Sequence, residues 1–300
     1  MRKEGICMSI LAVDIGGTSV KYALWQAESL QNPGNFQTPD SWSALQEELL
    51  RVLGEQAKQS PEEIEAVTIS VPGAVDSEAG VIGGYSAISY IHHFPFVTEL
   101  EAALGKPVFI ENDANCAGLA EAYYGAAKDA QSSVALIIGS GVGGAVILER
   151  QLIKGNSLFG GEFGYMLTEK GHTLSELASP VHAAKRYAKA MALAEAIDGQ
   201  QLFALAEKGD ERAQKEVAQI HRALAIGIYN ICLVVDPEVV CIGGGISTRS
   251  DFLEPVKEQL AQLQAQQHAE DQVITVKICE FQNDANLVGA VANYHLRKDQ

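Results

Sequence analysis

Three glycine-rich turns have the residue types that bind phosphate, and each follows an apolar run that predicts a buried strand. The first turn holds Asp14, Gly16, Gly17 and Thr18, with Lys21 beyond it. Glycines let backbone N–H groups approach a phosphate, the Thr18 hydroxyl adds a donor, and Asp14 is placed to hold Mg²⁺ through water. A hairpin turn with a solvated aspartate explains these residues equally well.

The second and third turns are Gly139-Ser140-Gly141-Val142-Gly143-Gly144 and Gly243-Gly244-Gly245. We expect the second to wrap another phosphate. A strand rather than a helix is predicted after it, so it is not a dinucleotide fingerprint. For the second turn, the alternative is a flexible or tightly packed turn. The third would let a flat nucleoside lie against the backbone; helix entry capped by Ser247 is the alternative. Three such turns at strand ends together favour a nucleotide site.

Two further segments present carboxylates. Glu111-Asn112-Asp113-Ala114-Asn115 lies between a predicted strand and an Ala-rich helix. There Asp113 is suited to accept a proton from a substrate hydroxyl, while Asn112 orients it. Helix capping is the competing interpretation, because Asn and Asp are favoured caps. The segment Gly160-Gly161-Glu162-Phe163-Gly164-Tyr165 offers a carboxylate and a phenol that suit sugar hydroxyls, or is an ordinary surface loop.

Strands and helices must alternate to position these segments. Apolar runs predict strands over 9–15, 20–25, 64–71, 107–110, 133–148 (a hairpin), 238–242 and 273–279. Helical spacing predicts helices over 41–59, 114–128, 210–235, 251–268 and 285–297. This alternation is typical of a layered α/β protein. Residues 10–24 and 134–148 share a pattern of strand, glycine turn and strand, which indicates two domains built on one plan around a cleft.

Composition excludes several classes of protein. An apolar fraction of 47% excludes disorder, and 22 Lys and Arg against 38 Asp and Glu give a formal charge of −16. This charge disfavours nucleic acid and anionic membranes as partners. No segment is expected to span a bilayer. Scattered cysteines (Cys7, Cys116, Cys232, Cys241 and Cys279) indicate a reduced, cytoplasmic protein.

Taken in order, these segments resemble the ROK family (repressor, open reading frame, kinase) of sugar kinases. The resemblance runs from Asp14-Ile15-Gly16-Gly17-Thr18 through 71–76, 111–115, 139–144, 160–162 and 242–245 to 283–290. It implies an α/β, actin-like ATPase (ribonuclease H-like) fold with two α/β domains around a cleft. The small N-terminal domain would comprise 1–114 plus 286–300, and the large C-terminal domain 115–285.

The resemblance also implies site residues, with ATP and Mg²⁺ as cofactors. Asp113 would be the catalytic base, and the sugar contacts would be Gly73, Asn112, Asp113, Glu162 and Tyr165. The first turn, with Asp14, Gly16, Gly17, Thr18 and Lys21, would bind phosphate and Mg²⁺. The second, with Gly139, Ser140, Gly141, Gly143 and Gly144, would bind another phosphate. Gly243, Gly244 and Gly245 would face the adenosine.

The sugar end departs from the family's pattern. Tyr165 replaces a histidine that binds zinc and touches the sugar, and 168–179 contains no cysteine, so no zinc site is expected. Ser175 occupies the position of a sugar-binding glutamate, with Glu176 beside it, and 85–91 lacks the family's usual asparagine. The adjacent histidines at 92 and 93 are interpreted as loop or core residues rather than metal ligands.

We therefore expect an ATP-dependent sugar kinase that transfers the γ-phosphoryl group to a hexose-type hydroxyl, O6, of glucose, a β-glucoside or an N-acyl hexosamine. The change to Ser175 favours the substituted sugars over free glucose, unless Glu176 replaces the missing contact. Alternatives are a non-catalytic sugar sensor that keeps the kinase fold and an actin-like polymer. A DNA-binding repressor is disfavoured by the charge and by the few residues before the first strand. The expected partner is a small sugar, and a homodimer is left open.

Overall fold

The computed structural model describes residues 9–298, which form two compact units. Unit 1 holds the described residues up to Ala120, Gly155–Phe159 and the described residues from Asp284 onward. Unit 2 holds Glu121–Lys154 and Gly160–Asn283. The division after Ala120 falls inside helix α3 (Asp113–Tyr123), so one continuous helix carries the chain from the first unit into the second.

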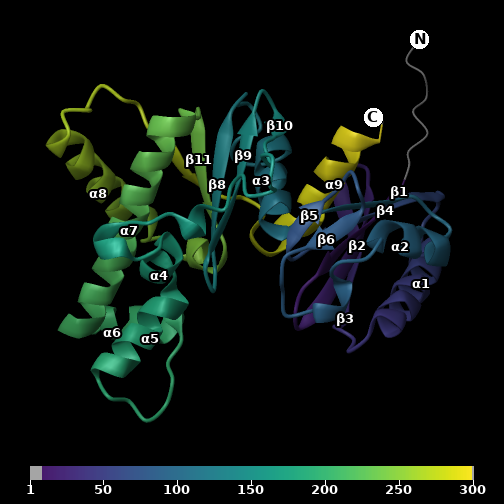
Figure 1. Ribbon diagram of the computed structural model, residues 1–300, viewed down its shortest axis with the longest axis horizontal. Coiled ribbons are helices and arrows are strands. Elements are labelled where there is room, and N and C mark those ends of the chain that lie inside the picture. The colour runs from purple at the N-terminus through teal and green to yellow at the C-terminus, as the bar shows by residue number, and fades with distance from the viewer. Residues whose placement is uncertain (1–8, 299–300) are drawn as a thin grey trace. The chain divides into compact units, whose positions relative to one another are not determined.

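Unit 1 is built on a five-stranded mixed sheet in the order β3-β2-β1-β4-β7 (Figure 1). The strands are β1 (Ser9–Ile15), β2 (Ser19–Gln26), β3 (Ser29–Gln37), β4 (Ile64–Val71) and β7 (Val108–Asn112). β1 pairs antiparallel with β2 and parallel with β4, and β4 pairs parallel with β7. Nearly every residue of β1 and β4 is buried, which is why both are continuous apolar runs rather than alternating ones.

The C-terminal helix of unit 1 packs on the N-terminal sheet. The unit's main helices are α1 (Trp42–Gln59), α2 (Phe96–Leu104) and α9 (Ala285–Arg297), and a hairpin of β5 (Ala74–Asp76) and β6 (Val81–Gly83) follows β4. Figure 1 shows α9 in yellow against the purple strands, which it contacts at β1 and β4. α9 and α3 cross at Gly289, where an added Cβ would lie 1.7 Å from the Cys116 carbonyl oxygen. Glycine is therefore required at this position for α9 to pack against α3.

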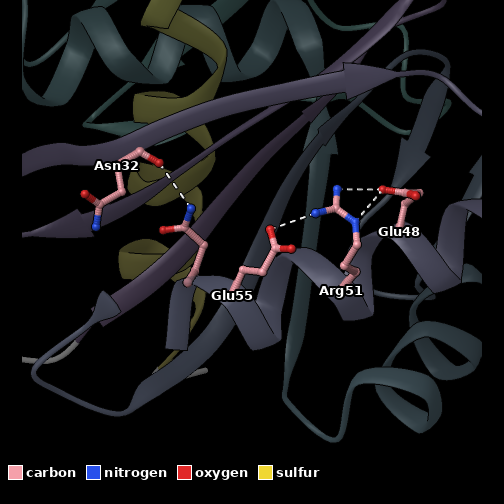
Figure 2. A network of polar contacts seen from close by, with 5 residues as sticks. Asn32, Glu48, Arg51 and Glu55 are labelled. Atoms are coloured by element: carbon pink, nitrogen blue, oxygen red, sulfur yellow. Dashed lines mark hydrogen bonds and ion pairs between the residues drawn. The ribbon is translucent and has the colours of Figure 1, made fainter. Parts of the chain in front are cut away.

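Polar contacts on α1 differ between its two faces. Gln56 is 4% exposed and donates from Nε2 to the Asn32 carbonyl of β3 at 3.2 Å. On the exposed face, Arg51 pairs with Glu48 and with Glu55, each at 2.7 Å (Figure 2). Solvent-exposed ion pairs contribute little stability, so the buried face of α1 holds the helix on the sheet.

Unit 2 repeats the plan of unit 1. Its sheet has the order β10-β9-β8-β11-β12. The strands are β8 (Ser133–Ile138), β9 (Val142–Leu148), β10 (Gln151–Leu152), β11 (Val239–Gly243) and β12 (Val276–Ile278). As in unit 1, a central strand pairs antiparallel with the strand that follows it and parallel with a later one. The strand orders thus agree with the two-domain plan indicated by the echo between 10–24 and 134–148.

Helices α4 (Leu174–Ala178), α5 (Pro180–Ala190), α6 (Gly199–Glu207), α7 (Glu211–Val235) and α8 (Leu253–Gln266) complete unit 2. Within residues 9–298, α7 alone has the length and apolar composition to cross a membrane. Its buried residues, including Ile220, Leu224, Ile228 and Ile231, lie in the core of unit 2. A core helix passes the same test of length and composition, so this feature is weak evidence for a membrane span.

The four described cysteines, Cys116, Cys232, Cys241 and Cys279, are buried free thiols. Cys7 lies outside the described residues. The cysteines are thus core residues in both units and do not form a disulfide framework among the residues described.

Candidate active site

The first glycine turn joins β1 to β2, with Asp14 opposite Lys21 in the strand register. The Gly16 N–H donates to the Ser19 carbonyl at 3.1 Å, which closes the turn. Thr38, just after β3, donates from its hydroxyl to the Gly16 carbonyl at 2.5 Å. An added Cβ on Gly16 would lie 3.0 Å from the Ser19 oxygen, so the turn is close to the limit that a side chain tolerates.

Asp14 at the end of β1 is held by two residues that the sequence pattern did not single out. Its Oδ1 accepts hydrogen bonds from the Ser70 hydroxyl at 2.9 Å and from Asn286 Nδ2 at 3.0 Å. Burial raises the pKa of Asp14 above its ordinary value, although the bonds from Asn286 and Ser70 and the charge of Lys21 act in the opposite direction. Carboxylate oxygen is a ligand type that Mg²⁺ prefers, so this residue fits a Mg²⁺ role through water.

Asn112 ends β7 and caps the helix that follows. Its Oδ1 accepts the N–H groups of Ala114 at 2.9 Å and Asn115 at 3.1 Å, and its Nδ2 donates to the Gly73 carbonyl at 3.0 Å. Asp113 Oδ1 also accepts the Ala114 N–H, at 2.8 Å, so the capping interpretation applies to both residues, with Asn112 accepting the larger number of bonds. Asp113 lies in the first turn of α3, where the helix N-terminus favours a negative charge.

Glu111 is the least exposed carboxylate of this segment, at 1% exposure. Its Oε1 accepts the Asn112 N–H at 2.8 Å and Asn115 Nδ2 at 3.0 Å, and its Oε2 accepts the Ser77 hydroxyl at 2.8 Å. Through these bonds, Glu111 connects the end of β7 with the first turn of α3 and with Ser77, the residue after β5. The sequence pattern assigned this residue no role, because only its depth in the fold reveals its partners.

Gly73, an expected sugar contact, lies beside His92. Its φ is +114°, and an added Cβ would lie 2.9 Å from the Gly83 carbonyl oxygen and 2.9 Å from His92 Cε1. His92 bonds through Nδ1 to the Gly83 carbonyl at 3.1 Å and through Nε2 to the Ser86 hydroxyl at 2.7 Å. His92 is therefore a loop histidine that supports this turn. Residues 9–298 contain no group of three or more His, Cys, Asp or Glu arranged to hold a metal ion.

In unit 2, the second glycine turn joins β8 to β9 and is shorter than we expected. The turn is 139–141, whereas Gly143 and Gly144 pair with β8 as strand residues. An added Cβ on Gly144 would lie 2.5 Å from Phe163 Cδ2, so this glycine makes room for packing. The region open to a phosphate therefore centres on Gly139, Ser140 and Gly141.

The third glycine turn follows β11, which lies parallel and adjacent to β8, so the second and third turns meet at one edge of the sheet. An added Cβ would lie 2.9 Å from Cys279 Sγ at Gly243 and 2.2 Å from the Ile138 carbonyl oxygen at Gly244. Nothing lies within 4 Å of one on Gly245. The Ser247 hydroxyl donates back to the Gly244 carbonyl at 2.7 Å. Packing thus explains Gly243 and Gly244, and Gly245 is the member that faces open space.

Glu162 and Tyr165 flank a short 3₁₀ turn, Phe163–Tyr165. Residues three apart in such a turn lie on one face. Both side chains are exposed, Tyr165 at 70%, whereas Phe163 is buried. Restricted solvation raises the pKa of Glu162 above its ordinary value. The pair therefore presents a carboxylate and a phenol together, as expected from the sequence.

Ser175 and Glu176 both form hydrogen bonds with other residues of unit 2, whereas a sugar-binding role requires bonds to a ligand. The Ser175 hydroxyl accepts the Val142 N–H at 3.0 Å. Glu176 forms a capping box at the start of α4, where its Oε2 accepts the Thr173 N–H at 2.8 Å. These bonds lower the pKa of Glu176. The structure therefore offers no support for Glu176 in the place of the missing sugar contact.

Comparisons with known proteins show which family the chain belongs to. The ROK family profile matches residues 10–296. A β-glucoside kinase from Klebsiella pneumoniae is 33% identical over 297 residues, which is 96% of each chain. A ROK family protein from Streptococcus pneumoniae TIGR4 in complex with sucrose has a TM-score of 0.86 and 33% identity, covering 98% of this chain and 100% of that one. A ROK hexokinase from Thermus thermophilus has a TM-score of 0.85 and 28% identity over the same shares. The chain therefore belongs to the ROK family and is a sugar kinase with an actin-like ATPase fold.

Proposed function

We propose that this sugar kinase uses ATP and Mg²⁺ to phosphorylate the O6 hydroxyl of a hexose that carries a substituent at C1, with a β-glucoside as the preferred acceptor. The observation that carries the proposal is the start of α3, where Asn112 supplies the cap and Glu111 fixes the strand end beneath Asp113. The similarity to a β-glucoside kinase supports the choice of acceptor.

Asp113 is the proposed general base. It accepts the proton of the sugar hydroxyl as the oxygen attacks the γ-phosphoryl group, a contribution of roughly 10²- to 10⁴-fold in rate. Because Asn112 caps the helix and also binds the Gly73 carbonyl, it fixes the direction of Asp113 relative to the turn at Gly73. Gly73, Asn112 and Asp113 are proposed sugar contacts, and Glu162 and Tyr165 are proposed as well because they present a carboxylate and a phenol.

The glycine turns are the proposed phosphate sites, at Gly16, Gly17 and Thr18 with Lys21, and at Gly139, Ser140 and Gly141. Backbone N–H groups fixed before the reaction stabilise charge that develops on the phosphoryl oxygens. Asp14 would hold Mg²⁺ through water; when bound, the ion neutralises charge on the β- and γ-phosphates. Gly245 is the proposed contact for the adenosine.

The preference for a substituted sugar follows from the residues at the sugar end. Ser175 bonds to Val142 and Glu176 bonds to Thr173, so neither offers a charged acceptor to a free 1- or 2-hydroxyl. Free glucose loses those hydrogen bonds, each worth about 0.5–1.5 kcal/mol. The exposed ring of Tyr165 suits stacking on an added group at C1.

The test is sugar-dependent ADP release with glucose, cellobiose, N-acetylglucosamine and N-acetylmannosamine as acceptors. We expect the highest kcat/KM for cellobiose, with a phosphate at the 6-position of the product. A clear preference for free glucose would contradict the acceptor assignment. No sugar-dependent release with any of the four would instead favour the non-catalytic sensor.

We also propose a reduced cytoplasmic setting and no nucleic-acid or membrane partner. The buried thiols and the net charge of −16 support this proposal. A homodimer is a further proposal, which light scattering of the purified protein tests directly.

A further inference from the structure

Ser179 links the second glycine turn to the helices that follow it in the chain. The residue is 0% exposed and lies at the N-cap of α5, where its Oγ accepts the Val181 N–H at 3.2 Å. The same hydroxyl lies 2.8 Å from the Gly139 carbonyl and 3.0 Å from the Ser140 carbonyl, and it donates to this pair. Capping α5 requires only the bond from Val181. The contacts with the Gly139 and Ser140 carbonyls, which lie far away in the sequence, therefore need another explanation.

The Ser179 hydroxyl shares its one proton between these two carbonyls, and this shared contact fixes the direction of two backbone N–H groups. The described peptide bonds are all trans, and in a trans peptide the C=O and the N–H point in opposite directions. The Gly139 carbonyl shares its peptide with the Ser140 N–H, and the Ser140 carbonyl shares its peptide with the Gly141 N–H. Because Ser179 holds both carbonyls toward the protein interior, the N–H groups of Ser140 and Gly141 point away from it.

Ser175, one helical turn before Ser179, holds the far end of the same turn. It accepts the Val142 N–H, which removes that donor from the set available to a ligand. Its hydroxyl oxygen would lie 3.1 Å from a Cβ added at Gly141 and 2.3 Å from one added at Gly164. Ser175 is therefore packed between Gly141 and Gly164, which leaves no space for the turn at 139–141 to move toward α4.

We propose that Ser179 is a positioning residue of the nucleotide site, which orients the Ser140 and Gly141 N–H groups toward a phosphate of ATP. This inference rests on the proposed function, because it assigns a phosphate to this turn. Two consecutive N–H groups that converge on one side form an anion-binding concavity. Gly139 and Ser140 are exposed, as a phosphate site requires.

The experiment compares Ser179→Ala, Ser179→Cys and Ser179→Thr with the wild type by calorimetric titration of ADP without sugar, followed by steady-state kinetics. Loss of the donor should raise the Kd for ADP about five- to tenfold in Ser179→Ala, with a matching rise in KM for ATP. KM for the sugar should change less than about twofold. Ser179→Cys keeps the volume with a weak donor and should weaken binding in the same direction, whereas Ser179→Thr keeps the hydroxyl and should restore it.

The matched control is Ser60→Ala in unit 1. Ser60 also bonds to several partners, Ser9, Gln26 and Glu62, so its loss should lower the thermal midpoint without changing the Kd for ADP. Unchanged ADP binding in folded Ser179→Ala or Ser179→Cys would overturn the inference. Equal rises in both KM values, as a loosened unit would give, would also overturn it.

The proposed function can fail separately. If the wild type binds ADP but releases none from ATP with any sugar, the kinase assignment for this acceptor class fails and the role of Ser179 stands. If the wild type does not bind ADP, both fail together.

Discussion

The two glycine turns at 16–18 and 139–141 have different backbone hydrogen bonds, Gly16 N–H to the Ser19 carbonyl and Gly139 N–H to the Gly141 carbonyl, but both are held by a hydroxyl from elsewhere in the chain. Each joins a central strand to its antiparallel neighbour, and in each a hydroxyl donates to the first glycine's carbonyl, Thr38 to Gly16 and Ser179 to Gly139. Thr38 comes from the next strand connection of the same sheet, whereas Ser179 comes from a distant helix cap. The repeat in sequence covers the strands and turns but not the residues that hold them.

The turns also differ in charge. Asp14 precedes the turn of unit 1, and the matching position in the echo is Ile138, which is 1% exposed. The unit 1 turn therefore has a carboxylate that suits a metal ion beside its backbone donors, and the unit 2 turn has only uncharged donors, the backbone N–H groups and the Ser140 hydroxyl. We expect loss of the unit 1 carboxylates to lower kcat, and loss of the hydroxyls that hold either turn to raise KM for ATP.

Among the proposed variants, Asp113→Asn in unit 1 should cause the largest fall in kcat. The change is nearly isosteric but removes the proton acceptor, so kcat should fall roughly 10²- to 10⁴-fold while KM for ATP changes little. Coupled assays of ADP release give both values, and circular dichroism melts verify folding. Retention of more than about a third of wild-type kcat would show that Asp113 is not the base.

Asp14→Asn should lower the activity of the enzyme but raise its thermal midpoint at neutral pH. Removing the carboxylate should lower kcat about 10- to 100-fold and weaken the dependence on Mg²⁺ concentration. Burial raises the pKa of folded Asp14, so its contribution to stability is present at low pH and is lost as the pH rises through the folded pKa.

At neutral pH, the variant should therefore have a higher thermal midpoint than the wild type, and the difference should shrink in mildly acidic buffer. The Asn side chain still accepts bonds from Ser70 and Asn286 through one oxygen. A midpoint that falls at neutral pH would contradict this account of Asp14.

The sequence predicted the glycine turns more fully than the residues that support them. Glycine spacing placed turns at 16–18 and at 139–144, of which 143 and 144 are strand residues, and the strand-to-helix change drew attention to Asp113, whose role as base stays a prediction. Ser70, Asn286 and Glu111 were missed as partners because their bonds form only when β4, α9 and α3 pack together.

Strand β3 is an element of the fold that the local sequence pattern did not predict. Its sequence contains Pro33 and Gly34 and has no apolar alternation, so no strand was predicted over 29–37. It is an edge strand, where few residues are buried, and an added Cβ on Gly34 would lie 2.4 Å from Tyr22 Cζ. Cross-strand packing on Tyr22, rather than local propensity, selects this glycine.

Ser175→Glu tests whether the sugar end is simply missing a carboxylate. Because Ser175 is packed between Gly141 and Gly164, a larger side chain must displace the turn, and overpacking costs about 1–3 kcal/mol. We expect KM for ATP to rise about tenfold and kcat/KM for glucose not to improve. Improved use of glucose with normal KM for ATP would show instead that the position still faces the sugar. Ser175→Ala is the control, since it removes the bond to Val142 without adding bulk.

The smallest expected effect comes from Thr38→Val, which removes the hydroxyl but keeps the shape of the side chain. Thr38 holds one carbonyl, that of Gly16, whereas Ser179 holds two, so the unit 1 turn should lose less order than the unit 2 turn. One hydrogen bond is worth about 0.5–1.5 kcal/mol, so KM for ATP should rise roughly two- to fivefold, below the effect of Ser179→Ala. Thr38→Ser should return it to the wild-type value. A larger effect in Thr38→Val than in Ser179→Ala would reverse the comparison, and would mean that the turn beside Asp14, rather than the turn at 139–141, provides most of the affinity for the nucleotide.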